Sequence, residues 1–294
     1  MEDNFDQGLF GQILNLNEFL HYLYINNLYP KFIFKSKHYG LEEDNYNIFP
    51  YIFSQNKISK IHKNEINNVF LKSVSFEDDT TIYLNRKFCM NYKDKNNYPK
   101  KNNFKYINKL LNIYFKINPI LIEKSNNILN SYSNILGLHY RGTDKINSNE
   151  NYKQITNDLY ILILKELIKK YKFNVIFLAT DDYNIENIIK NNINIKILKQ
   201  QNIVKYKNKP IHFSNEINGK DKTQQAFIDC LCLTKCNYVL ITNSALGGWS
   251  KILNHNLKIF KLHKNTQDWF PMNSIEYYKS QNKLIQNKLN KLQQ

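Results

Sequence analysis

One arginine follows an apolar run and has the clearest capacity for chemistry in this chain. Of the 41 basic residues only Arg86 and Arg141 are arginine. Arg141 comes after the apolar residues 135–140 and before Gly142, which predicts a strand that ends in a turn. A guanidinium can bind phosphate or carboxylate through two parallel N–H groups, as lysine cannot. We therefore expect an anion site at Arg141. A structural pair with Asp144 that braces the turn is compatible with it.

A second apolar run, Phe177-Leu178-Ala179-Thr180, ends in the paired carboxylates Asp181 and Asp182. One interpretation is a divalent metal site. Two adjacent side chains point in different directions, however, so they rarely chelate one ion by themselves. We expect one of them to cap the following helix. The other would brace Arg141 or Lys145, or bind a ligand hydroxyl.

A single acid, Asp229, lies in a predicted helix over residues 223–234 among Phe, Ile and Leu. A lone carboxylate in apolar surroundings is costly unless it is paired. Guanine offers N1–H and N2–H₂ together, which match the two carboxylate oxygens. The alternative is an aspartate on the helix surface at the edge of a sheet, and the sequence leaves both interpretations open.

The segment Thr242-Asn243-Ser244 stands between a predicted strand and a predicted helix. Backbone N–H groups and a serine at a helix N-terminus form a phosphate site, although Ser244 could equally be an ordinary N-cap. Near the start of the chain, Gly8 and Gly11 form a glycine turn before the first helix. By itself that turn is weak evidence for a ligand.

The elements that must position these residues alternate regularly in the second half of the chain. Apolar runs predict strands at 135–140, 174–179, 194–198, 238–242 and 257–262, and helical spacing predicts helices at 152–171, 185–190, 223–234 and 246–253. This is typical of a parallel α/β sheet with helices on both faces, whose ligands lie at the carboxyl ends of the strands. We assign 129–270 to a Rossmann-like lobe, 1–128 to a less regular α/β lobe with a helix at 104–117, and 271–294 to a helix that packs back.

Composition excludes several other classes of protein. The net charge is +16 over 294 residues, but the lysines are scattered rather than clustered, which argues against a nucleic-acid-binding protein. No transmembrane span and no secretory signal are visible, so we expect a cytoplasmic protein. The four cysteines match neither a zinc site nor a disulfide framework, so we expect free thiols and no bound metal: Cys89, Cys230, Cys232 and Cys236.

The segment His139-Tyr140-Arg141-Gly142-Thr143-Asp144-Lys145 resembles the H-x-R-R-T-D-K signature of the α-1,6-fucosyltransferase and nodulation fucosyltransferase family. The Leu-Ala-Thr-Asp-Asp run, the helix with Asp229 and the Thr-Asn-Ser segment follow in that family's order, and residues 8–12 are similar to its early glycine turn. The resemblance implies two Rossmann-like lobes of the GT-B type. It also implies an inverting, metal-independent fucosyltransferase without a cofactor, which uses GDP-fucose as co-substrate and a glycan or other hydroxyl acceptor.

The resemblance also implies residue roles. Arg141 would hold the β-phosphate with Ser244, and His139 and Asp229 would contact guanine. The remaining members of the predicted site would shape it: Gly8, Gly11, Asn243, Asp144, Lys145, Asp181 and Asp182.

The chain departs from the family at two positions. The second arginine of the signature is Gly142 here, and the family's acceptor-site glutamate is Asn149, which leaves Glu150 as the candidate base. A non-catalytic GDP-sugar or glycan-binding protein is therefore the second hypothesis. A basic nucleic-acid-binding protein is the third.

Overall fold

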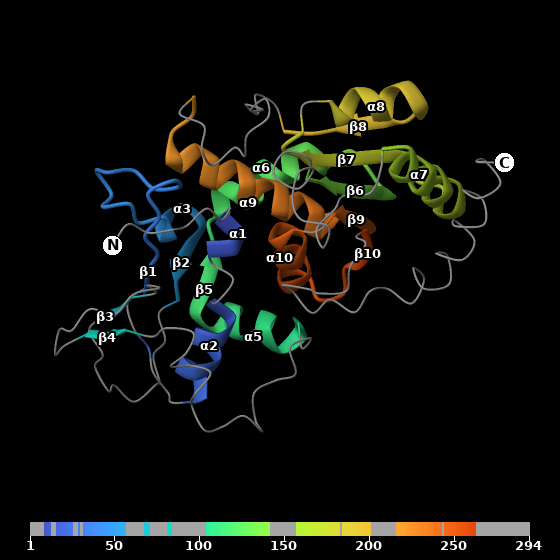
Figure 1. Ribbon diagram of the computed structural model, residues 1–294. Helices are drawn as coiled ribbons and strands as arrows, with labels where there is room; N and C mark the ends of the chain where they lie inside the picture. The colour runs from blue at the N-terminus through green and yellow to red at the C-terminus, as the bar shows by residue number, and fades with distance from the viewer. Residues whose placement is uncertain are drawn as a thin grey trace. The chain divides into compact units, whose positions relative to one another are not determined.

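The computed structural model describes residues 9–12, 16–25, 29, 32–56, 68–70, 81–83, 104–141, 157–182, 184–200, 216–242 and 244–262 (Figure 1). The chain divides into two compact units. The first comprises Met1–Glu123 and Asn215–Ile228, and the second comprises Lys124–Ser214 and Asp229–Gln294. The helix α9 (Gly219–Lys235) contributes residues to both. The predicted C-terminal helix, 271–294, lies outside the described residues.

A five-stranded parallel sheet forms the second unit. Its strands are β6 (Ile135–Tyr140), β7 (Val175–Thr180), β8 (Lys196–Leu198), β9 (Tyr238–Thr242) and β10 (Lys258–Leu262), in the order β10-β9-β6-β7-β8. Every residue of β6 is buried, as are the first five of β7. Such continuous apolar strands are stable only when both faces of the sheet are covered. The predicted parallel sheet with flanking helices is confirmed.

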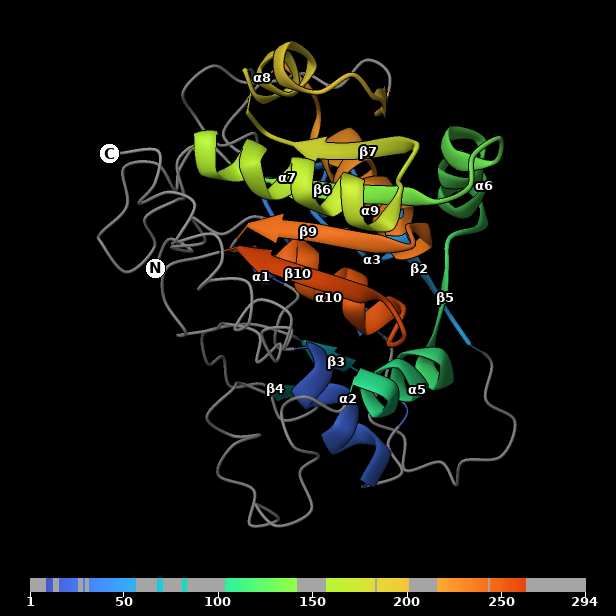
Figure 2. The same ribbon diagram turned by 90° about the vertical axis from the view of Figure 1, so that its right-hand side faces the viewer.

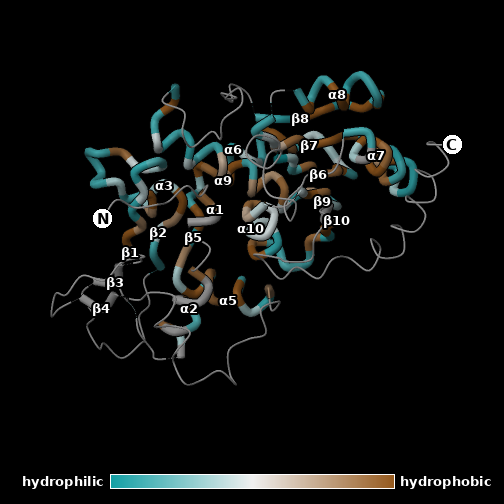
Figure 3. The backbone as a smooth tube through the Cα atoms, viewed as in Figure 1, coloured by the Kyte–Doolittle hydropathy of each residue, from teal (hydrophilic) through white to brown (hydrophobic). Residues whose placement is uncertain are grey.

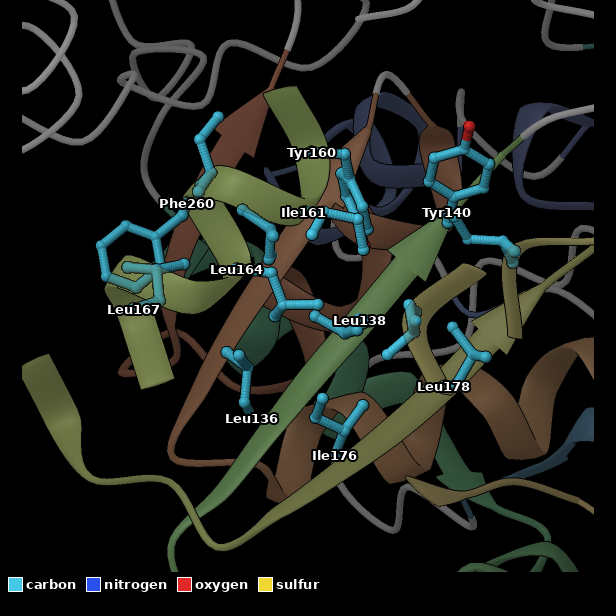
Figure 4. Packing of buried hydrophobic residues seen from close by; sticks show 14 of the residues in the cluster. Leu136, Leu138, Tyr140, Tyr160, Ile161, Leu164, Leu167, Ile176, Leu178 and Phe260 are labelled. Carbon is cyan, nitrogen blue, oxygen red and sulfur yellow. The ribbon is translucent and has the colours of Figure 1, made fainter. Parts of the chain in front are cut away.

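One face of this sheet packs against α7 (Asn157–Tyr171) and α8 (Ile185–Asn192). Alternate residues of β6, Leu136, Leu138 and Tyr140, contact side chains of α7 such as Tyr160 and Leu164 (Figure 4). Figure 3 shows hydrophobic stretches along β7. It shows both hydrophobic and hydrophilic residues on α8, as expected of a helix that is buried on one side only.

The other face is covered by the second part of α9 and by α10 (Ala245–Leu253), which lie across the sheet from α7 (Figure 2). Gly137 allows this close packing. A Cβ atom at this position would lie 2.9 Å from Cys236 Sγ and 2.9 Å from Leu233 Cδ2, both from the α9 side. The rare glycine in an otherwise bulky strand therefore admits the helix.

The first unit holds shorter elements around an aromatic core. Its helices are α1 (Leu9–Gln12), α2 (Leu16–Ile25), α3 (Phe49–Ile52), α5 (Phe104–Tyr114) and the start of α6 (Pro119–Leu129). Its strands form a parallel sheet of β1 (Phe32–Ile33), β3 (Asn68–Phe70) and β4 (Thr81–Tyr83), and an antiparallel pair of β2 (Phe53–Gln55) and β5 (Phe115–Ile117). Rings such as Phe32 and Phe115 meet edge to face, with centroids 4.6 Å apart.

The prediction of one helix over 104–117 is wrong at its end. The helix α5 stops at Tyr114, and Phe115–Ile117 form β5 because they pair with β2. Pro119 begins α6, where its missing N–H costs nothing. The Asn118 side chain accepts a hydrogen bond from Ile120 N at 3.1 Å and so supports this start. Within the described residues no helix is long and apolar enough to cross a membrane.

Candidate functional site at the carboxyl edge of the parallel sheet

The strand order reverses between β6 and β9. From β6 the chain adds β7 and β8 on one side, and then returns to add β9 and β10 on the other. Ligands of open α/β sheets bind outside the carboxyl ends of the strands at such a reversal. A direct bond joins the two strand ends here, since Arg141 N donates to Thr242 Oγ1 at 2.9 Å. Thr242 has no assigned role in the sequence analysis, and the pairing of β6 with β9 reveals this one.

The side chain of Arg141 lies toward β7. Its Nε is 3.9 Å from Asp181 Oδ2, and the two side chains are 21% and 16% exposed. This ion pair confirms the predicted brace between one carboxylate and Arg141. It holds a forked cation, partly open to solvent, at the centre of the edge.

The neighbouring Asp182 lies just before the next helix, α8, whose N-cap is Asn184. Its Oδ1 accepts hydrogen bonds from Asn184 N at 2.6 Å and from Ile185 N at 3.2 Å. These backbone donors have no partner within the helix, so the carboxylate satisfies them. One of the two aspartates, Asp182, thus supports the start of α8 from two positions before the N-cap, while the N-cap residue itself, Asn184, makes no side-chain cap bond.

Ser244 caps α10 at the same edge. Its Oγ accepts a hydrogen bond from Leu246 N at 3.2 Å, which confirms the N-cap interpretation. The hydroxyl hydrogen is a separate donor, and the first turn of α10 adds the positive end of a helix dipole. Capping and anion binding are therefore compatible at Ser244.

His139 is buried beneath this edge. It alternates with Leu138 and Tyr140, which belong to the α7 face, so it lies on the face covered by α9 and α10. Burial, and then the charge of Arg141, lowers the pKa of His139 from 6.5 to about 3. The imidazole is therefore neutral at physiological pH. Its Nδ1 is buried and has no hydrogen-bond partner among the residues that the structure describes.

Asp229 is bound by a residue that sequence reasoning did not identify. Gln200 Nε2 donates to Asp229 Oδ1 at 2.6 Å, and the Gln200 side chain is buried. Gln200 follows the carboxyl end of β8, so this pair belongs to the same edge of the sheet. No local pattern marks Gln200, because its partner is far away in the sequence.

The structure brings together five of the predicted residues at one edge, through adjacent strands: His139, Arg141, Asp181, Asp182 and Ser244. Asp229 is tied to the same edge by its hydrogen bond from Gln200, which follows β8. Gly11 lies in α1, in the first unit. The other predicted positions lie outside the described residues: Gly8, Asp144, Lys145, Glu150 and Asn243. Among the described residues no group of three or more His, Cys, Asp or Glu side chains could hold a metal ion.

No family model and no curated protein sequence matches this chain. Solved structures do match it. NodZ α-1,6-fucosyltransferase soaked with GDP-fucose aligns at 15% identity and TM-score 0.51, over 84% of this chain and 89% of that chain. The same enzyme co-crystallised with GDP aligns at 15% identity and TM-score 0.50, over 87% and 92%.

POFUT1 in complex with GDP aligns at 8% identity and TM-score 0.40, over 54% of this chain and 50% of that chain, so the match spans half of POFUT1. The likeness to NodZ establishes a mixed α/β fold similar to that of a fucosyltransferase.

Proposed function

We propose that this chain is a glycosyltransferase that takes its sugar from a GDP-sugar, and that GDP-fucose is its donor. One observation carries the proposal: Arg141 stands at the reversal of strand order, tied by its backbone to β9 and by its side chain to β7. This is where an α/β sheet binds a nucleotide, and a guanidinium is the side chain that best matches a diphosphate. The fold similarity to NodZ, which was soaked with GDP-fucose in one structure and co-crystallised with GDP in another, supports the choice of donor.

In the proposed reaction an acceptor hydroxyl attacks the anomeric carbon of the sugar. The new C–O bond forms as the bond from carbon to the diphosphate oxygen breaks, and the configuration inverts. Negative charge develops on the departing GDP, where Arg141, the Ser244 hydroxyl and the N-terminus of α10 would stabilise it without a metal. The hydroxyl proton would pass to a carboxylate, Glu150 or Asp144, and Lys145 would complete the catalytic group.

The base of the nucleotide would lie toward Asp229. A carboxylate accepts hydrogen bonds only, so it selects a base edge that presents donors, as guanine does with N1–H and N2–H₂. His139, kept neutral by burial, would add a hydrogen-bonding nitrogen. Residues 1–128 would form the lobe that receives the acceptor. The remaining predicted residues would complete the donor site: Gly8, Gly11, Asp181, Asp182 and Asn243.

Calorimetric titration tests the proposal. We expect the chain to bind GDP and GDP-fucose, to bind UDP and ADP much more weakly, and to be insensitive to EDTA. Arg141→Lys keeps the charge but removes the fork, and we expect it to lose about tenfold or more in GDP affinity. Lys165→Gln removes an exposed charge on α7 and serves as the matched control. Unchanged GDP binding in the Arg141→Lys variant would contradict the phosphate role.

Gly142 favours a second candidate function, because it removes a cation that the resembling family carries. The chain would then bind GDP-sugars without transferring the sugar. GDP release from GDP-fucose in the presence of a glycan acceptor panel separates the two. Turnover supports the transferase, whereas tight binding with no release above the uncatalysed rate supports the binding protein.

A further inference from the structure

We propose that Thr242 is a positioning residue for the Arg141 guanidinium, and that it acts on the binding of the donor's diphosphate rather than of its base. The inference rests on the proposed function, to which it adds a residue. It starts from the Thr242 hydroxyl, which bonds two main-chain groups of the neighbouring segment at once. The hydroxyl accepts a hydrogen bond from Arg141 N at 2.9 Å and donates one to His139 O at 3.4 Å.

The packing of β9 does not require this hydroxyl. Thr242 is the last residue of the strand and is 3% exposed, and the three residues before it are apolar and buried. Valine has a similar shape and also favours strands, whereas a buried hydroxyl costs free energy unless it is hydrogen-bonded. The hydroxyl is therefore explained by its two main-chain partners at the carboxyl edge of the sheet.

The sheet holds these two partners differently. His139 lies inside the sheet, where it is in register with residues of both β7 and β9. Arg141 follows Tyr140, the last residue of β6, and so lies just beyond the strand. The Thr242 hydroxyl extends the connection between β6 and β9 to Arg141 N. Loss of the hydroxyl should therefore displace Arg141 more than His139.

Such a displacement matters most for a phosphate. A guanidinium binds phosphate through parallel N–H groups, so both the place and the direction of its fork count. The pair with Asp181 acts on the side chain of Arg141, whereas Thr242 acts on its main chain. A binding group must be held within about 0.5 Å of its productive position. Because Arg141 would hold the β-phosphate, GMP, which lacks that phosphate, is the matched probe.

Calorimetric titration with GDP and GMP tests the inference on the full chain. Thr242→Val removes the hydroxyl and keeps the shape of the side chain. We expect it to reduce GDP affinity by about tenfold and GMP affinity by less than about twofold. Thr242→Ser keeps the hydroxyl and should keep the wild-type ratio of the two affinities. Thr242→Ala also removes the hydroxyl and covers the case in which the valine variant does not fold.

Two further variants separate positioning from general support of the fold. Thr234→Val removes a hydroxyl that donates to Leu231 O at 2.6 Å within α9, and it should leave the GDP/GMP ratio unchanged. If Thr242 acts through Arg141, the double variant Arg141→Met/Thr242→Val should have the same ratio as Arg141→Met alone.

The outcomes are distinct. A GDP/GMP ratio that keeps its wild-type value when the hydroxyl is removed overturns the inference and leaves the proposed function standing. A ratio that falls as far in Thr242→Ser as in Thr242→Val also overturns it, because the methyl group would then be the cause. Absence of GDP binding to the wild-type protein overturns the proposed function, and the inference with it.

Discussion

The buried imidazole of His139 predicts how the stability of this protein depends on pH. Burial, and then the charge of Arg141, lowers the pKa of His139 from 6.5 to about 3 in the folded chain. In the unfolded chain the pKa returns to about 6.5. Between these values the unfolded chain binds a proton that the folded chain does not. The contribution of His139 to stability is therefore complete above about pH 6.5 and is lost as the pH falls toward 3.

The magnitude follows from linkage. Once the unfolded imidazole is protonated, each further pH unit costs about 1.4 kcal/mol of unfolding free energy. Between about pH 7.5 and about pH 5.5 the expected loss from His139 is about 1.4 kcal/mol. His139→Leu has no titrating group at this position, so it should lack this part of the loss.

Urea unfolding of both proteins at the two pH values measures the effect. Subtracting the change in the variant from the change in the wild type cancels every group that the two proteins share. NMR gives an independent measure, since the His139 ring signal should not titrate down to about pH 4. Equal pH dependence in both proteins would refute the reasoning, because it would mean that the folded imidazole accepts a proton as easily as the unfolded one.

Three further perturbations have defined outcomes. In Gly219→Ala the new Cβ would lie 2.3 Å from Gly40 O, a backbone atom that cannot rotate away, so urea unfolding should show a loss of about 1–3 kcal/mol. Ser244→Ala removes the cap of α10 and should cost about 1 kcal/mol, whereas Ser244→Asp should retain the cap. Burial raises the pKa of three thiols, so a thiol reagent should modify them only in the unfolded chain: Cys230, Cys232 and Cys236.

The sequence predicts the parallel sheet well because its strands are buried on both faces. The runs over 135–140 and 238–242 coincide with β6 and β9. Prediction is poorer where long-range pairing decides the structure. Residues 115–117 continue the apolar pattern of α5, yet they form a strand because β2 lies beside them. That contact joins segments about 60 residues apart, and no local propensity contains it.

The site was predictable as a set of residues but not as an arrangement. Arg141, Asp181 and Ser244 each follow an apolar run, so each can be placed at a carboxyl end of a strand. Which strands are neighbours is a property of the sheet order, and only that order puts Asp181 beside Arg141. The same limit hid Gln200, which has no motif around it and donates a hydrogen bond to Asp229, 29 residues away in the sequence.

The net charge of +16 offers a rival explanation for any binding of GDP, and the geometry of Arg141 tells the two apart. Scattered, solvated lysines attract every polyphosphate alike, and at 1 M salt such attraction is screened within about 3 Å. Arg141 is held between β9 and β7, and a bound diphosphate would be partly shielded there. We therefore expect GDP to remain preferred over ADP and UDP as salt is raised, although all three affinities fall. Titration of the three nucleotides at low and high salt measures this. If high salt removes the preference for guanine, the binding arises from surface charge and the site at Arg141 is not its cause.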